Sequence, residues 1–213
     1  MADRHDVSSQ QQVDVQVGER RVAANVAVPD RATGVVVVAG GPSQDAQLGR
    51  IAHDLREARL ATFLLHVEPP AAEEDPEAPT AERTAWEQAR IAGAVGRLRQ
   101  ERTTADLPIG LFVQGAAAEG AMRAAARVSI DALVSYNGRF GPDGRDRGDD
   151  PRPPILLLVD AEAPAHVSAE NEAVRWAMGE RTELQGLPAA FRSDEERLQR
   201  VVAIAVRWFD RHL

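Results

Sequence analysis

Residues 107–120 read LPIGLFVQGAAAEG, and this stretch decides the fold of the chain. The apolar run 109–113 is typical of a buried strand, whereas the alanine-rich run after it is typical of a helix. Gly115 stands between the two, and glycine adopts a positive φ without the steric penalty of a Cβ atom. The stretch therefore predicts a strand, a sharp turn at Gly115 with φ above zero, and a helix.

Strand and helix patterns alternate along the rest of the chain. Two short stretches near the start alternate apolar and polar residues and predict a hairpin, and a valine-rich run is typical of a strand buried on both faces. This order predicts an α/β fold with a mostly parallel sheet of about eight strands and helices on both faces. Strands are expected at 12–17, 21–28, 34–39, 61–66, 109–113, 132–136, 155–159 and 183–187, and helices at 44–59, 81–100, 116–126, 168–178 and 194–213.

The composition narrows the classes of function. The chain has 213 residues, no cysteine and no lysine, and its formal net charge is −8. The missing cysteine excludes disulfides and thiol nucleophiles, and the missing lysine excludes a Schiff base or a P-loop lysine. The negative charge disfavours nucleic-acid and anionic-membrane partners, because phosphates are held by basic surfaces.

The N-terminal residues help to predict the cellular compartment of the protein. Residues 1–12 are polar, lack the apolar run of a secretory signal and are expected to form a flexible tail, which leaves 13–213 as a single α/β domain. No apolar run approaches the length of a membrane span. With the absence of cysteine, these features predict a cytoplasmic protein.

Four stretches carry a family resemblance. They are GVVVVAGG at 34–41, LATFLL at 60–65, ADLPIGLF at 105–112 and WFDRHL at 208–213. Through them the chain resembles the dienelactone hydrolase group of the α/β-hydrolases, in its small single-domain form, over nearly its full length. The resemblance implies an α/β-hydrolase fold in which residues 113–117 form the turn that carries the family's nucleophilic serine.

The catalytic positions depart from the family pattern. The serine position falls on Gly115, and the histidine position, in the loop after the last strand, falls on about Ala189. The acid position, after the penultimate strand, is filled by Asp160 or Glu162. A triad acts as a unit, so the resemblance implies an acid with no base to orient.

The oxyanion hole departs from the pattern as well. The family's His-Gly after the third strand corresponds to Gly40–Gly41, and the next residue is Pro42, which has no N–H to donate. The N–H of Ala116 remains as one donor. We therefore expect a catalytically degenerate α/β-hydrolase-like protein with a binding or interaction role.

The expected binding site is the rim at the carboxyl ends of the strands. The small residues at the catalytic positions leave room for a modest pocket lined partly by Gln114 and Phe191. The partner would be an unidentified small molecule or protein, and a homodimer is left open. Other rim residues expected to line the site are Gly41, Ser43, His66, Gly115, Ala116 and Asn137.

A relocated catalytic site is the alternative. Ser43 follows the third strand, His66 ends the fourth and Asp160 ends the seventh, so all three are expected at one rim. Such a site would make the chain an active ester or lactone hydrolase. The competing interpretation is that Ser43 caps the helix after it and that His66 is a half-buried strand-end residue.

No metal or cofactor is expected. His166 is placed in the loop after Asp160, but their spacing matches no defined metal site. The acidic runs 73–77 and 143–150 are typical of solvated loops, and the second lacks the later glutamate of a calcium loop. No GxGxxG follows a strand, which argues against a nucleotide cofactor.

Overall fold

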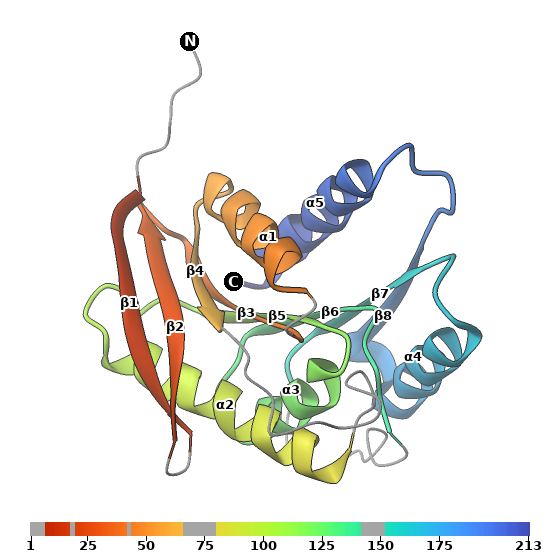
Figure 1. Cartoon of the computed structure of the whole chain (residues 1–213), viewed down its shortest axis with the longest axis horizontal. Coiled ribbons are helices and arrows are strands. Elements are labelled where there is room, and N and C mark those ends of the chain that lie inside the picture. The colour runs from red at the N-terminus through yellow and green to blue at the C-terminus, as the bar shows by residue number, and fades with distance from the viewer. Residues whose placement is uncertain (1–6, 18–19, 42–43, 66–79, 142–151) are drawn as a thin grey trace.

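The structure, a computed structural model, describes residues 7–17, 20–41, 44–65, 80–141 and 152–213. Eight strands form one sheet in the order β1-β2-β4-β3-β5-β6-β7-β8 (Figure 1). β1 pairs with β2 and β2 with β4 in antiparallel fashion, and all other pairs are parallel. The strands are β1 (Val7–Val17), β2 (Arg20–Pro29), β3 (Gly34–Ala39), β4 (Leu60–Leu65), β5 (Ile109–Gln114), β6 (Ala132–Tyr136), β7 (Ile155–Asp160) and β8 (Thr182–Leu187).

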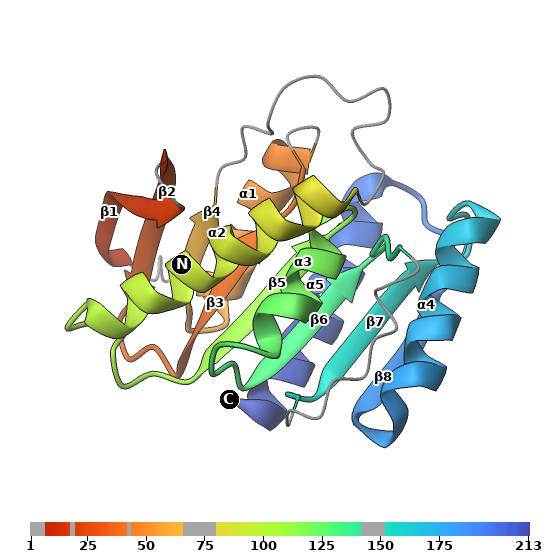
Figure 2. The ribbon, with the colours of Figure 1, turned by 90° about the horizontal axis from the view of Figure 1, so that it is seen from below.

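Helices cover both faces of the sheet. Helices α2, α3 and α4 lie on one face, and α1 and α5 lie on the other (Figures 1 and 2). Two buried apolar clusters match these layers, because alternate strand residues point to opposite faces. The helices are α1 (Asp45–Glu57), α2 (Ala81–Gln100), α3 (Ala117–Ala125), α4 (Ala165–Met178) and α5 (Asp194–His212), with a short 3₁₀ helix η3 (Gly179–Arg181) between α4 and β8.

The predicted α/β architecture is confirmed, with shifts at some boundaries. β1 begins at Val7, so residues 7–12, expected in a flexible tail, pair with β2 instead. α4 begins at Ala165, which places His166 in the first turn of a helix and not in a loop. Val167, in this first turn, is buried.

Several expected site residues lie outside the described residues. These are Pro42, Ser43 and His66, together with the acidic runs 73–77 and 143–150. Within the described part of the chain, no helix is both long and apolar enough to span a bilayer.

Candidate functional site

The turn between β5 and α3 has the conformation that the sequence predicts. Gly115 has a φ of 59°, which confirms the expected left-handed turn. Its N–H donates to the carbonyl of Tyr136 at 3.3 Å, and its own carbonyl accepts from the N–H groups of Ala118 and Arg139 at 3.2 and 3.0 Å. The elbow is thus held from β6, from α3 and from the loop after β6, although no side chain stands at its apex.

Glutamine side chains occupy the rim beside the elbow. Gln114, the last residue of β5, donates from Nε2 to Oε1 of Gln47 in α1 at 2.8 Å. The N–H of Gly41, after β3, donates to Oε1 of Gln44 at 2.9 Å. Because both donors bond within the protein, neither the N–H of Gly41 nor Nε2 of Gln114 points freely at a ligand.

The acid at the end of β7 is held by two side chains of β6 and its loop. Oδ2 of Asp160 accepts from the hydroxyl of Tyr136 at 2.7 Å and from Nδ2 of Asn137 at 2.8 Å. The N–H of Asp160 donates to Oδ1 of Asn137 at 2.9 Å. Asn137 adopts a φ of 47°. Its two hydrogen bonds with Asp160 stabilise this left-handed conformation. Burial raises the pKa of Tyr136, and the hydrogen bond to Asp160 raises it further.

Two acceptor atoms at this rim remain without a hydrogen-bond partner among the described residues. They are Oε1 of Gln114 and Oδ1 of Asp160, and both atoms are buried. A buried acceptor without a donor costs about 1–3 kcal/mol.

The loop after β8 carries no base. Ala189 is exposed and ends in a methyl group at the position where the family resemblance implies histidine. The loop is anchored at the start of α5, where the Ser193 hydroxyl accepts from the N–H of Glu196 at 3.2 Å. Phe191 is half-buried, with the guanidinium of Arg197 over its ring at 6.0 Å.

Two carboxylates fix the loop after β6. Oε2 of Glu119 accepts from the N–H of Gly141 at 2.7 Å, and Oε2 of Glu170 accepts from the N–H of Phe140 at 2.9 Å. Neither glutamate is predicted from the sequence, because each lies on a helix far along the chain from the loop. Tyr136 is not predicted either, since its only signal is a tyrosine at a strand end next to a predicted rim residue.

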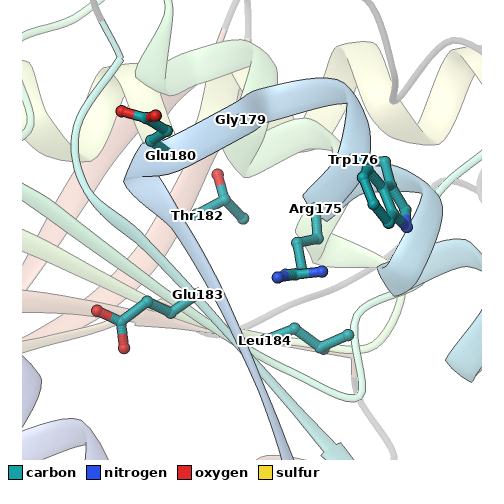
Figure 3. A pocket seen from close by; sticks show the side chains of 7 residues that line it. All are labelled: Arg175, Trp176, Gly179, Glu180, Thr182, Glu183 and Leu184. Carbon is teal, nitrogen blue, oxygen red and sulfur yellow. The ribbon is translucent and has the colours of Figure 1, made fainter.

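The structure brings together only part of the expected site. Gln114, Asn137 and Asp160 lie at the carboxyl ends of β5, β6 and β7, which are neighbours in the sheet. Ala116 and Gly41 are buried on the same rim. The expected rim pocket beside Phe191 and Gln114 stays a prediction. A pocket of about 500 Å³ lies at the other end of the last strand, between α4 and β8 (Figure 3).

Solved structures show what this arrangement is similar to. The chain matches a dienelactone hydrolase from Anabaena variabilis with a TM-score of 0.78 and 27% identity, covering 96% of this chain and 98% of that one. It matches an α/β serine hydrolase without a lid from Xanthomonas campestris with a TM-score of 0.69 and 16% identity, covering 96% and 95%. The chain has the α/β-hydrolase fold.

Sequence comparison matches this chain to a relative whose name does not refer to hydrolysis. A Mycobacterium tuberculosis protein that carries the provisional name phosphoribosyl transferase is 29% identical over 210 residues, which cover 95% of this chain. The chain spans only 46% of that relative's length. No family model matches the chain.

Proposed function

We propose that this α/β-hydrolase-fold protein does not hydrolyse esters and that its rim serves to bind a small molecule or a protein. One observation carries the proposal: the elbow keeps its left-handed turn at Gly115, where no hydroxyl is available for acylation. Phosphoribosyl transfer is not part of the proposal, because the chain spans less than half of the relative that bears this name.

The surroundings of the acid support this function. In a triad the carboxylate accepts from the histidine ring and holds it in place. Here Oδ2 of Asp160 accepts from Tyr136 and Asn137 instead. The acid therefore stabilises the loop after β6, and the exposed methyl group of Ala189 offers no general base.

The kinetic test uses p-nitrophenyl acetate and a dienelactone, with the Anabaena variabilis dienelactone hydrolase as the active control. We expect no turnover above a buffer-plus-albumin background, and no labelling by a fluorophosphonate probe, because the elbow lacks a nucleophile. Turnover by the unmodified protein that is lost in Ser43→Ala or His66→Ala would overturn the proposal and establish the relocated site.

Restoring side chains one at a time tests the same assignment. Gly115→Ser alone is expected to remain inactive, because its hydroxyl has no base beside it and triad members act together. Adding Ala189→His supplies a base and is expected to give slight activity, limited by Pro42 in the oxyanion loop. Equal activity of the single and double variants would show that Ala189 does not mark the base position.

A further inference from the structure

The loop after β6 begins with an asparagine that is followed by a glycine, Asn137 and Gly138. The asparagines of the chain are Asn25, Asn137 and Asn171, and only Asn137 precedes a glycine. In an Asn-Gly pair, no side chain hinders attack by the glycine nitrogen on the side-chain carbonyl carbon of the asparagine. By its sequence, Asn137 is therefore the asparagine most reactive toward deamidation, the loss of the side-chain amide as ammonia.

The fold favours both residues of this pair. Asn137 adopts a φ of 47°, a left-handed conformation that glycine, asparagine and aspartate tolerate best. At Gly138 an added Cβ would stand 2.8 Å from Cβ of Ala118 and closer still to Oγ of Ser135. The packing of this loop against β6 and α3 therefore keeps a glycine after the asparagine in spite of the reactivity of the pair.

Deamidation at this pair needs only water as a co-reactant. The backbone nitrogen of Gly138 loses its proton and attacks Cγ of Asn137, which closes a succinimide ring, and the Cγ–Nδ2 bond breaks as ammonia leaves with a proton. Water then adds to one of the ring carbonyl carbons and opens the ring. The product is aspartate or isoaspartate at position 137, and each has a new carboxylate in place of the amide.

Asp160 holds the side-chain amide of Asn137 at both of its polar atoms. Nδ2 of Asn137 donates to Oδ2 of Asp160 at 2.8 Å, and the N–H of Asp160 donates to Oδ1 of Asn137 at 2.9 Å. The N–H of Asn137 donates to the carbonyl of Leu158 at 2.8 Å, so its backbone and its side chain are both attached to β7. Attack requires Cγ to turn toward the nitrogen of Gly138, and this rotation breaks both hydrogen bonds to Asp160.

The backbone after Asn137 is held as well. The carbonyl of Gly138 accepts from Nδ2 of Asn171 in α4 at 2.7 Å, and Asn171 is fully buried. The N–H of Arg139 donates to the carbonyl of Gly115 at 3.0 Å, which attaches the next residue to the elbow. The reactive pair is therefore fixed by α4, by β7 and by the turn after β5.

We propose that Asn137 is a deamidation site that its hydrogen bonds to Asp160 keep closed, and that its conversion to aspartate or isoaspartate releases the loop after β6. The reaction removes the N–H donor that Oδ2 of Asp160 accepts from. It also adds a second negative charge at this place, and like charges that share a site repel each other. Because the lost ammonia is not regained in water, the release is permanent.

The first experiment measures the deamidation rate of the full chain in mildly alkaline buffer. A synthetic peptide with the sequence of residues 132–141 is the unprotected reference. Water labelled with heavy oxygen marks only the reaction during incubation, and fragmentation of the intact protein in a mass spectrometer assigns the label to Asn137. We expect Asn137 to react at least about tenfold more slowly in the protein than in the peptide, because attack requires local opening. Equal rates would overturn the proposal.

Two variants remove different hydrogen bonds from the same carboxylate. Asp160→Ala removes the acceptor of Nδ2 of Asn137 and is expected to raise the rate at least about fivefold, since a hydrogen bond to a charged group is lost. Tyr136→Phe removes the hydroxyl that donates to Oδ2 of Asp160 but leaves both bonds of Asn137, so the rate should stay close to that of the unmodified chain. If Asp160→Ala does not fold, Asp160→Asn replaces it, and a smaller rise is expected because an amide oxygen takes the place of the carboxylate. Equal rates of the Asp160 and Tyr136 variants would contradict the proposed role of Asp160.

Amide exchange tests the release of the loop. Asn137→Asp places the carboxylate of the product beside Asp160 and is expected to speed exchange at Phe140 and Gly141, whose N–H groups bond to carboxylates of α4 and α3. Asn137→Gly also removes the amide and allows the left-handed φ but adds no charge, so it should speed exchange less. Equal effects of the two substitutions, or no effect of Asn137→Asp, would overturn the release. These outcomes do not depend on whether the rim hydrolyses esters.

Discussion

Gly115 forms the turn between β5 and α3, at the position where the family resemblance implies a serine. The left-handed φ of 59° suits glycine, whereas a residue with a Cβ atom adopts it at a cost. Here the turn connects β5 to α3 without that cost.

Placing a side chain at the elbow should lower stability. Gly115→Ala is expected to reduce the free energy of unfolding by about 1–2 kcal/mol, the cost of the left-handed conformation for a residue with a Cβ. The measurement is urea denaturation followed by circular dichroism. Gly186→Ala, where a Cβ meets open space, is the control and should change stability little. Equal effects of the two substitutions would contradict the strain at Gly115.

Tyr136 is the other residue whose environment can be tested directly. It is the only tyrosine, and the chain has no lysine or cysteine, so no other side chain titrates near pH 10. Burial and the hydrogen bond to Asp160 raise its pKa, so the folded state binds the proton more tightly than the unfolded state. The resulting stability is full below about pH 10, the unfolded pKa, and is lost as the pH rises further.

Alkaline titration measures this effect. Tyrosinate absorbance is expected at a higher pH in the folded protein than in urea, and the free energy of unfolding is expected to fall above about pH 10. Tyr136→Phe should remove this fall. A tyrosinate signal at the same pH in folded and unfolded protein would show that Tyr136 is not held as described.

At the scale of elements, α2 contains two glycines that differ in how closely other atoms approach them. Gly93 lies against β1, where an added Cβ would stand 2.6 Å from the carbonyl oxygen of Gln16. Gly96, one turn later, has open space at that position. The first allows the helix to approach the hairpin closely, and the second only adds flexibility to the unfolded chain.

Alanine at these two positions should have opposite effects. Gly96→Ala is expected to stabilise the protein by about 1 kcal/mol, the difference in helix propensity. Gly93→Ala is expected to destabilise it, because the methyl group forces α2 away from the backbone of β1. Thermal unfolding of both variants and the unmodified protein checks the signs. A stabilising Gly93→Ala would mean that α2 and β1 are not in close contact.

At the scale of the whole molecule, a buried ion pair lies where α2 packs on α3. Arg90 is fully buried and donates to Oε2 of Glu87 from Nη2 at 2.6 Å and from Nε at 2.9 Å. α3 approaches this part of α2 so closely that a Cβ on Gly120 would stand 2.4 Å from Cβ of Glu87. The pair therefore lies in the contact between two helices that cover the same face of the sheet.

Removing the arginine of this ion pair should show the energetic cost of burying the glutamate charge alone. Arg90→Ala is expected to lower the free energy of unfolding by about 3–5 kcal/mol, since it leaves a buried carboxylate uncompensated. Arg97→Ala on the same helix, which breaks the partly exposed pair with Glu101, should cost less than about 1 kcal/mol. Urea unfolding of the two variants measures the contrast, and similar losses would contradict the buried pair.

The order of elements, most of their boundaries and the turn at Gly115 could be predicted from the sequence. Apolar periodicity and glycine conformation act over a few residues, so local patterns contain that information. The expectation that the chain lacks the family's serine and histidine also comes from the sequence, because both positions lie in short segments adjacent to predicted strands.

Only the tertiary structure decided how the remaining polar groups are used. That Asp160 bonds to Tyr136 and Asn137, that Glu119 and Glu170 hold the loop after β6, and that a pocket lies between α4 and β8 all depend on contacts between distant segments. Such contacts depend on strand order and helix packing, which place residues side by side without leaving a local pattern in the sequence.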